Sequence, residues 1–144
     1  MELAKKKLNA VSVILRASQS IQDVIRKDAA RYELNPTEFA VLELLYHKGD
    51  HPIQVIGENV LISSSSITYV VDKLERKKFV VRKACPEDRR VTYASLTSLG
   101  KTLMDQVFPQ LEKKLGQLFE QLTDEDINKT IELLKQIGHH AKIV

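Results

Sequence analysis

The stretch SSSSITYVVDKLERKKFVVRKACPEDRRVTYASLT, residues 63–97, decides the fold. The apolar residues of its first half are Ile67, Val70, Val71 and Leu74. Their i, i+3, i+4, i+7 spacing is that of a helical stripe facing a core. After Lys78 the pattern changes, and β-branched and aromatic residues fill 79–81 and 91–96 on either side of a turn at 85–88. The stretch therefore predicts a helix over 63–78 followed by a β-hairpin.

Helices are predicted upstream of this stretch as well. Residues 4–32 carry apolar residues at helical spacing without glycine or proline. A second helix starts at Asn35, its N-cap, with Pro36 in the first turn and Glu38 three residues after the cap. A short third helix is expected over about 53–60. The first helix would extend about 42 Å at 1.5 Å per residue, which is more than a domain of this size can bury against itself, so it is expected to reach a partner chain.

Downstream of the hairpin the helical period returns. A leucine stripe begins after Gly100, and Pro109 is expected to kink or divide that helix. Thr123 and the three acidic residues after it cap a last helix. The order of the elements predicts a mainly α fold with a small β-hairpin wing, in one domain over 1–144. It is a winged helix-turn-helix over about 34–98, flanked by dimerisation helices over about 4–32 and 100–142.

Positive charge gathers in the same central segment. The formal net charge of the chain is +3, whereas residues 63–90 hold eight Lys and Arg against four Asp and Glu, a net +4 that leaves −1 for the rest. A local surface for nucleic acid has this distribution. A solvated charged face would look similar, so the charge alone leaves both interpretations open.

Several classes of protein are not expected. The longest apolar run, 39–42, has four residues, whereas a membrane-spanning helix needs about 20, and the basic N-terminus lacks the apolar block of a signal peptide. One cysteine excludes an internal disulfide and fits a reducing cytoplasm. The four histidines show no metal-ligand spacing, and no phosphate loop or nucleophile elbow appears. We therefore expect a cytoplasmic protein that is no enzyme and holds neither metal nor cofactor.

The exposed face of the 63–78 helix is the candidate for reading DNA. A major groove about 12 Å wide admits one helix, and the serine-rich start of the helix suits phosphate binding, although simple capping explains the serines equally well. Asp72 either pairs with Arg76 one turn later or accepts from a cytosine amine. The candidate DNA-binding residues are Ser63, Ser64, Ser65, Ser66, Thr68, Tyr69, Lys73, Arg76, Arg82, Asp88, Arg89 and Arg90.

These residues resemble the MarR family of regulators. The resemblance rests on Ser65-Ser66-Ile67-Thr68, Val71-Asp72-Lys73-Leu74-Glu75, Val80-Val81-Arg82, Asp88-Arg89-Arg90, Leu96-Thr97, Gly100 and, upstream, Asn35-Pro36-Thr37-Glu38-Phe39. Lys78 departs from the glycine that usually ends the family's recognition helix. The resemblance implies a homodimer on the double-stranded DNA of a palindromic operator. It also implies that Asp88 orients Arg90 into the minor groove while Arg89 meets the backbone; a surface salt bridge of little value is the plainer interpretation.

The segments 52–58, 63–69 and 83–88 look like a branch of the family that includes quinone- and hydroquinone-responsive repressors. This likeness implies a stress response and a small aromatic effector between the dimerisation helices and the DNA-binding lobe. Leu15, Phe39 and Tyr46 are candidates to line that cavity, if they are not simply core.

Two other functions stay open. Cys85 lies near Lys83, Arg89 and Arg90, which could lower the pKa of its thiol and make it a redox sensor; a passive thiol is the alternative. A winged helix can also bind a protein instead of DNA. Such modules usually lose the cations of the recognition helix and wing, which this chain keeps.

Overall fold

The computed structural model describes residues 1–60 and 64–144, with the side chains of Ser64 and Ser65 left out. The chain divides into two compact units, Met1–Val107 and Phe108–Val144. The boundary falls inside one helix, and each unit is described by itself.

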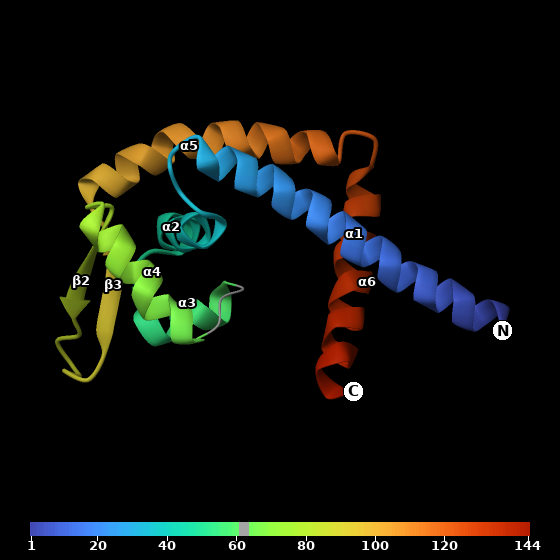
Figure 1. Cartoon of the computed structure of the whole chain (residues 1–144), viewed down its shortest axis with the longest axis horizontal. Coiled ribbons are helices and arrows are strands. Elements are labelled where there is room, and N and C mark those ends of the chain that lie inside the picture. Colours follow the sequence, from blue (N-terminus) through green and yellow to red (C-terminus); the bar gives the residue numbers. More distant parts are fainter. Residues whose placement is uncertain (61–63) are drawn as a thin grey trace. The chain divides into compact units, whose positions relative to one another are not determined.

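The first unit carries most of the secondary structure. Its elements are α1 (Glu2–Ala30), α2 (Pro36–Lys48), β1 (His51–Pro52), α3 (Ile53–Asn59), α4 (Ser64–Arg76), β2 (Val80–Ala84), β3 (Thr92–Leu96) and the start of α5 (Ser98–Leu118) (Figure 1). The second unit holds the rest of α5 and α6 (Asp124–Ile143). This is the mainly helical, winged fold that the sequence predicts.

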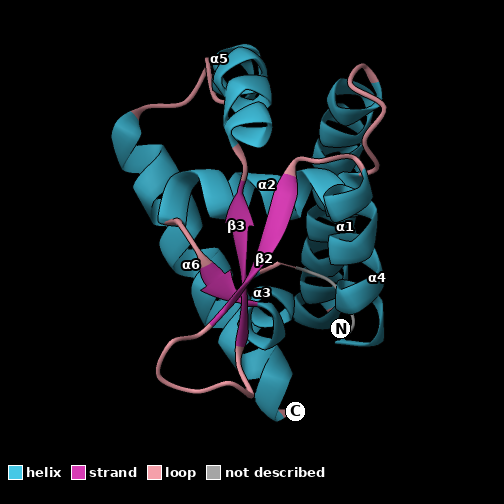
Figure 2. Cartoon of the chain, turned by 90° about the vertical axis from the view of Figure 1, so that its left-hand side faces the viewer, coloured by secondary structure: helices cyan, strands magenta, loops and turns pink. Residues whose placement is uncertain are grey.

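The sheet has one strand more than the predicted hairpin. Its antiparallel order is β1-β3-β2, with Val80 opposite Leu96 and His51 opposite Ala94. Figure 2 shows β2 and β3 as the two labelled strands of this sheet. A strand of two residues is too short to show a period of two in the sequence, so β1 could not be predicted. Its pairing ties the segment before α3 to the wing.

The core of the first unit lies among α2, α3, α4 and the hairpin. The buried stripe of α4 consists of Ile67, Val70, Val71 and Leu74, as predicted. From the other elements, Phe39, Leu42, Ile56, Val80 and Ala94 are almost fully buried. This packing fixes α4 by its apolar face and leaves its opposite face to the solvent.

Two helices end in the same left-handed turn without glycine. At the end of α4, Lys78 has a φ of 69°, its N–H donates to Glu75 and the N–H of Phe79 donates to Leu74. Glu33 repeats this arrangement after α1 with a φ of 59°. The paired bonds are those of a Schellman motif, which glycine adopts most easily. Lys78 therefore takes the conformation of the glycine that it replaces.

The corner between α4, the wing and α5 is tightly built. The Thr97 hydroxyl donates to the Lys78 carbonyl at 2.6 Å and accepts from the Gly100 N–H at 3.0 Å, which caps α5. The Thr97 N–H donates to the Phe79 carbonyl at 3.0 Å. A Cβ at Gly100 would overlap that same carbonyl oxygen. These contacts give the Leu96-Thr97 and Gly100 motif a structural reason.

Of the two effects expected of Pro109, a kink or a division of the C-terminal helix, division is wrong, because α5 runs unbroken from Ser98 to Leu118. Proline removes one N–H, the one that would bond to Asp105, and the turns on either side keep their own bonds. In the second unit, Thr123 and Asp126 form a capping box at the start of α6. No helix within 1–60 and 64–144 is long and apolar enough to cross a membrane.

Candidate nucleic-acid interface

One face of α4 is open to solvent. Thr68, Tyr69 and Arg76 are exposed on it, and Tyr69 is exposed to 60%. Ser66 and Asp72 are half-buried. Of the other serines, Ser63 lies outside the described residues, and Ser64 and Ser65 belong to the first turn of α4. The predicted face therefore exists over the part of the helix whose side chains are described.

The wing holds the predicted pair of Asp88 and Arg90. Oδ1 of Asp88 accepts from the backbone N–H of Arg90 at 3.0 Å and from its Nε at 3.1 Å, and Oδ2 accepts from a terminal guanidinium nitrogen at 3.3 Å. These bonds lower the pKa of Asp88. The Arg90 side chain is 91% exposed, and Arg89 is exposed beside it. The structure thus pairs Asp88 with Arg90, while the orientation of Arg90 into the minor groove and its contact with DNA stay predictions.

Arg82 does not project from the wing. Its guanidinium meets Asp72 at 2.6 Å and Glu75 at 2.5 Å, with only 27% of the side chain exposed. Burial lowers the pKa of Arg82, but the two carboxylates raise it by more. Arg82 therefore clamps β2 to α4. The ion-pair partner of Asp72 is thus Arg82, whereas Arg76 was the partner considered from the sequence. The sequence signal for this clamp is the i, i+3 spacing of Asp72 and Glu75, which places both carboxylates on the same face of the helix.

Other cations of the central segment also turn inward. The Lys73 ammonium lies 3.8 Å from Glu38 and 5.7 Å from the centre of the Tyr69 ring, and Lys77 pairs with the same carboxylate at 2.8 Å. Of the eight cations in 63–90, those with no ion pair within the described part of the chain are Arg76, Lys78, Lys83 and Arg89. The number of cations free to contact a phosphate is therefore smaller than the eight Lys and Arg that the sequence places in 63–90.

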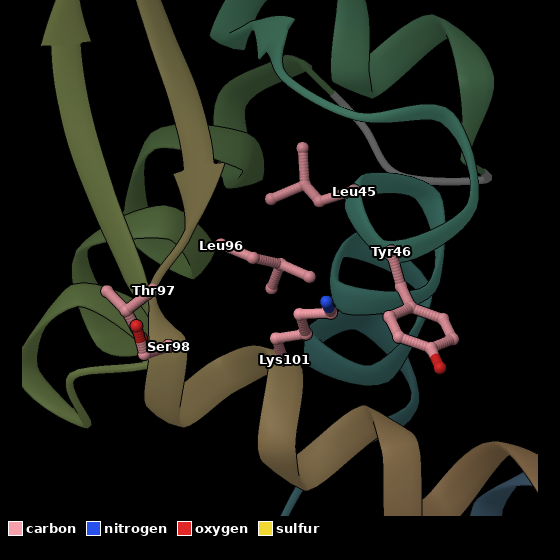
Figure 3. Close-up of a pocket in the computed structure, with 6 residues that line it drawn as sticks. All are labelled: Leu45, Tyr46, Leu96, Thr97, Ser98 and Lys101. Atoms are coloured by element: carbon pink, nitrogen blue, oxygen red, sulfur yellow. The ribbon is translucent and has the colours of Figure 1, made fainter.

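A pocket of about 310 Å³ lies at the base of the wing. Its lining is Leu45 and Tyr46 from α2, Leu96 and Thr97 from the end of β3, and Ser98 and Lys101 from the start of α5 (Figure 3). The Tyr46 hydroxyl donates to Asp105 at 2.6 Å, a bond that raises the pKa of Tyr46. The lining combines apolar side chains with hydroxyls and one ammonium group.

The three residues predicted to line an effector cavity do not meet there. Tyr46 lines the pocket, but Phe39 is a core residue, 1% exposed, and Leu15 lies on α1 with 64% of its surface exposed. Ser98 and Lys101 could not be predicted from the sequence, because no pattern distinguishes pocket residues in the first turns of a helix.

Cys85 is half-buried as a free thiol in the wing, where its N–H donates to the Val91 carbonyl at 3.0 Å. Among the residues that the structure describes, no cluster of three or more His, Cys, Asp or Glu side chains could hold a metal ion.

Comparisons with known protein sequences point to one family. The model of the MarR family matches residues 34–92. The chain is 47% identical over 140 residues to the HTH-type transcriptional regulator MhqR of Bacillus subtilis strain 168, with 97% of each chain covered.

Solved structures share the fold. AbsC, a MarR family transcriptional regulator from Streptomyces coelicolor, superposes with a TM-score of 0.86 at 22% identity over 96% of each chain. BpsR of Bordetella bronchiseptica, whose DNA binding is regulated by 6-hydroxynicotinic acid, has a TM-score of 0.77 at 21% identity over 90% of this chain and 98% of its own. At these identities the structures show the winged-helix fold alone.

Proposed function

The chain belongs to the MarR family of transcription regulators, and from this premise we propose that it is a homodimeric repressor of a palindromic operator that a small aromatic effector releases. The observation that carries the proposal is the joined surface of α4 and the wing. The Arg82 clamp holds the wing on α4, and the Asp88–Arg90 pair presents an exposed guanidinium on that wing.

The two parts of this surface have different tasks. The exposed face of α4, from Ser66 through Thr68 and Tyr69 to Arg76, enters the major groove and reads base edges. Ser64 and Ser65, in the first turn of α4, and Ser63, which precedes them in the sequence, take phosphate contacts. Arg90 enters the minor groove and Arg89 meets the backbone. Arg82 and Lys73 act from behind the interface, because carboxylates of the chain already hold them.

A second copy covers the apolar side chains that the helices leave exposed. On α1 these are Leu3, Leu8, Val11, Val13 and Leu15; on α6 they are Ile131, Leu133, Leu134, Ile137 and Ile143. Exposed apolar patches of this extent mark interaction sites in water-soluble proteins. Each dimer thereby offers two recognition helices to the two halves of a palindrome. Each protomer of that dimer is one copy of the single domain predicted over 1–144.

The pocket at the base of the wing is the proposed effector site. Its volume of about 310 Å³ is at the small end of ligand pockets, which suits a single aromatic ring. Leu45 and Leu96 offer apolar contact, and Lys101 can pair with a phenolate or a quinone oxygen. Such a ligand releases DNA only if it binds better to the conformation that does not fit the operator. A stress response to phenols or quinones follows from this site.

Binding to a fluorescent duplex that carries the region upstream of the chain's own gene tests the proposal. We expect affinity to fall about 10³-fold or more between roughly 50 and 200 mM salt, because a dimer makes about 6–10 phosphate contacts. Phenols and quinones are then added one at a time, and a true effector releases the wild type but not a Lys101→Met variant.

The outcomes separate the remaining functions. Weak, sequence-indifferent binding at all salt concentrations would contradict the proposal and favour a protein partner for the winged helix. Release by a quinone that is lost in Cys85→Ser but kept in Lys101→Met would place the sensor at the thiol. No catalytic activity is proposed, in keeping with the regulators to which the chain is similar.

A further inference from the structure

The ammonium group of Lys77 lies where three helices of the first unit meet. It is 2.8 Å from Oε2 of Glu38, at the start of α2, and donates at 2.9 Å to the carbonyl of Glu33, in the turn that ends α1. Lys77 itself directly follows the last residue of α4. One side chain thus joins the end of α4 to the start of α2 and to the turn that ends α1.

Glu38 is an unusual partner for it, because this carboxylate is buried to 1% exposure. Its Oε1 accepts from the backbone N–H of Asn35 at 3.1 Å and lies 3.8 Å from Lys73. Its Oε2 meets no hydrogen-bond donor of favourable geometry within the described residues, so the ammonium of Lys77 is what balances that oxygen. A buried charge without compensation is expensive, and the position of Lys77 is therefore strongly determined.

The contacts of Glu38 and Lys77 constrain the part of α4 that the core does not fix. The apolar stripe of α4 sets its rotation, through Val71 and Leu74. Lys77 opposes a slide of the helix along its axis, because its partners belong to the turn before α2 and to the capping box of α2, which the bond from Glu38 N–H to Asn35 closes at 2.8 Å.

We propose that Glu38 and Lys77 are positioning residues that hold α4 at the height from which its exposed face meets the base edges, and that Lys77 makes no contact with DNA. The inference rests on the proposed function. Base recognition needs side chains to be placed within a fraction of an ångström, so a loosened α4 loses specific contacts first. Phosphate contacts carry no sequence information, so binding to unrelated DNA does not depend on the base contacts that a loosened α4 loses.

The direction in which one substitution changes DNA affinity separates this proposal from a simple effect of charge. Glu38→Gln removes a negative charge from a DNA-binding unit. If charge alone mattered, the variant would bind all DNA somewhat more tightly. If Glu38 positions α4, the variant binds the operator more weakly while its binding to unrelated DNA stays the same. The amide keeps an oxygen for the Asn35 N–H and nearly the same shape.

The experiment compares the full-length wild type with Glu38→Gln and Lys77→Met on operator and scrambled duplexes across a salt series. We expect each variant to lose about tenfold in operator affinity, the discrimination of one good base contact, with unchanged affinity for the scrambled duplex. The slope of log affinity against log salt should stay constant, since each lost phosphate contact would lower it by about 0.9. Glu43→Gln and Lys48→Met remove the same charges elsewhere on α2 and should bind as the wild type does.

A double variant keeps the test decisive. Glu38→Gln with Lys77→Met should bind no more weakly than the worse single variant, because both remove one interaction. Additive losses, tighter operator binding by Glu38→Gln, or a salt slope lowered in Lys77→Met would overturn the proposal. If Glu38→Gln does not fold, the one-third-exposed Lys77 carries the test alone. If the wild type itself prefers no duplex, the proposed function fails, and this inference fails with it.

Discussion

A single methyl group at Gly100 is expected to disrupt the corner that joins the recognition helix, the wing and α5. The new Cβ would overlap the Phe79 carbonyl oxygen and lie 3.1 Å from both the Phe79 carbonyl carbon and Leu96 Cδ2. Because non-bonded heavy atoms settle about 3.5–4.0 Å apart, relief requires a movement of about 1 Å. That movement stretches the 3.0 Å bond from Thr97 N–H to the same carbonyl.

The cost follows from three effects. Overpacking a tight site costs about 1–3 kcal/mol, and the strained hydrogen bond is worth about 1 kcal/mol. Alanine regains up to about 1 kcal/mol over glycine in a helix. The net loss in the free energy of unfolding is therefore about 2 kcal/mol, a fall in Tm of about 7 °C for a chain of this length.

Thermal and urea unfolding at one fixed protein concentration measure this loss. Gly116→Ala and Gly138→Ala are the matched controls, because a Cβ at either position meets no atom within 4 Å. Both should be as stable as the wild type or slightly more stable. A Gly100→Ala variant that unfolds together with these controls would refute the reasoning.

Four further predictions follow from the same structure. Lys78→Gly should raise the free energy of unfolding by about 0.5–1 kcal/mol in urea titrations, because glycine adopts the φ of 69° without the cost that a side chain carries; an unchanged midpoint would contradict it. Arg82→Gln should weaken operator binding by about tenfold, the worth of one good base contact, because it frees the wing from Asp72 and Glu75; gel filtration checks that the dimer persists, and equal affinity would refute the clamp. Asp88→Ala and Arg90→Ala should each weaken operator binding by about tenfold or more. The double variant should bind no more weakly than Arg90→Ala, since the carboxylate acts through the guanidinium. Additive losses in the same binding assay would count against that pairing. Burial raises the pKa of Glu43 above 4.5, although His47 opposes this. The protonated form is thus favoured on folding, and stability is lost as pH rises through the raised pKa. Glu43→Gln should therefore raise Tm at neutral pH, with an advantage that vanishes below about pH 4.5; a Tm difference that does not change with pH would disprove it.

The sequence alone predicts those helices whose apolar residues recur at helical spacing or whose first residues form a capping signal. The stripe from Ile67 to Leu74 and the capping signal at Asn35 gave α4 and α2 correctly. The Asp88–Arg90 pair was implied by the resemblance to the MarR family, and the structure forms it across a turn at 89–90, not along an extended segment. Pro109 shows the limit of such rules, because one missing bond does not stop a helix whose neighbouring turns are intact.

The parts that could not be predicted depend on contacts between distant segments. Arg82 looks like a DNA-facing cation in the sequence, and Lys77 adds to the positive charge of 63–90. Only the fold shows the carboxylates of Asp72 and Glu38 beside them. Lys101 joins the pocket because α5 starts where β3 ends. A count of charges along the chain cannot separate cations that bind the chain's own carboxylates from those that are free to meet phosphate.

Hydroxyl-radical footprinting on the region upstream of the chain's own gene tests most directly whether the surface of α4 and the wing reads DNA as a dimer. We predict two protected half-sites centred about 34 Å apart, one helical turn, with the outer edges of protection lost in Arg90→Ala. Uniform, weak protection that Arg90→Ala leaves unchanged would contradict both the dimer and the wing contact.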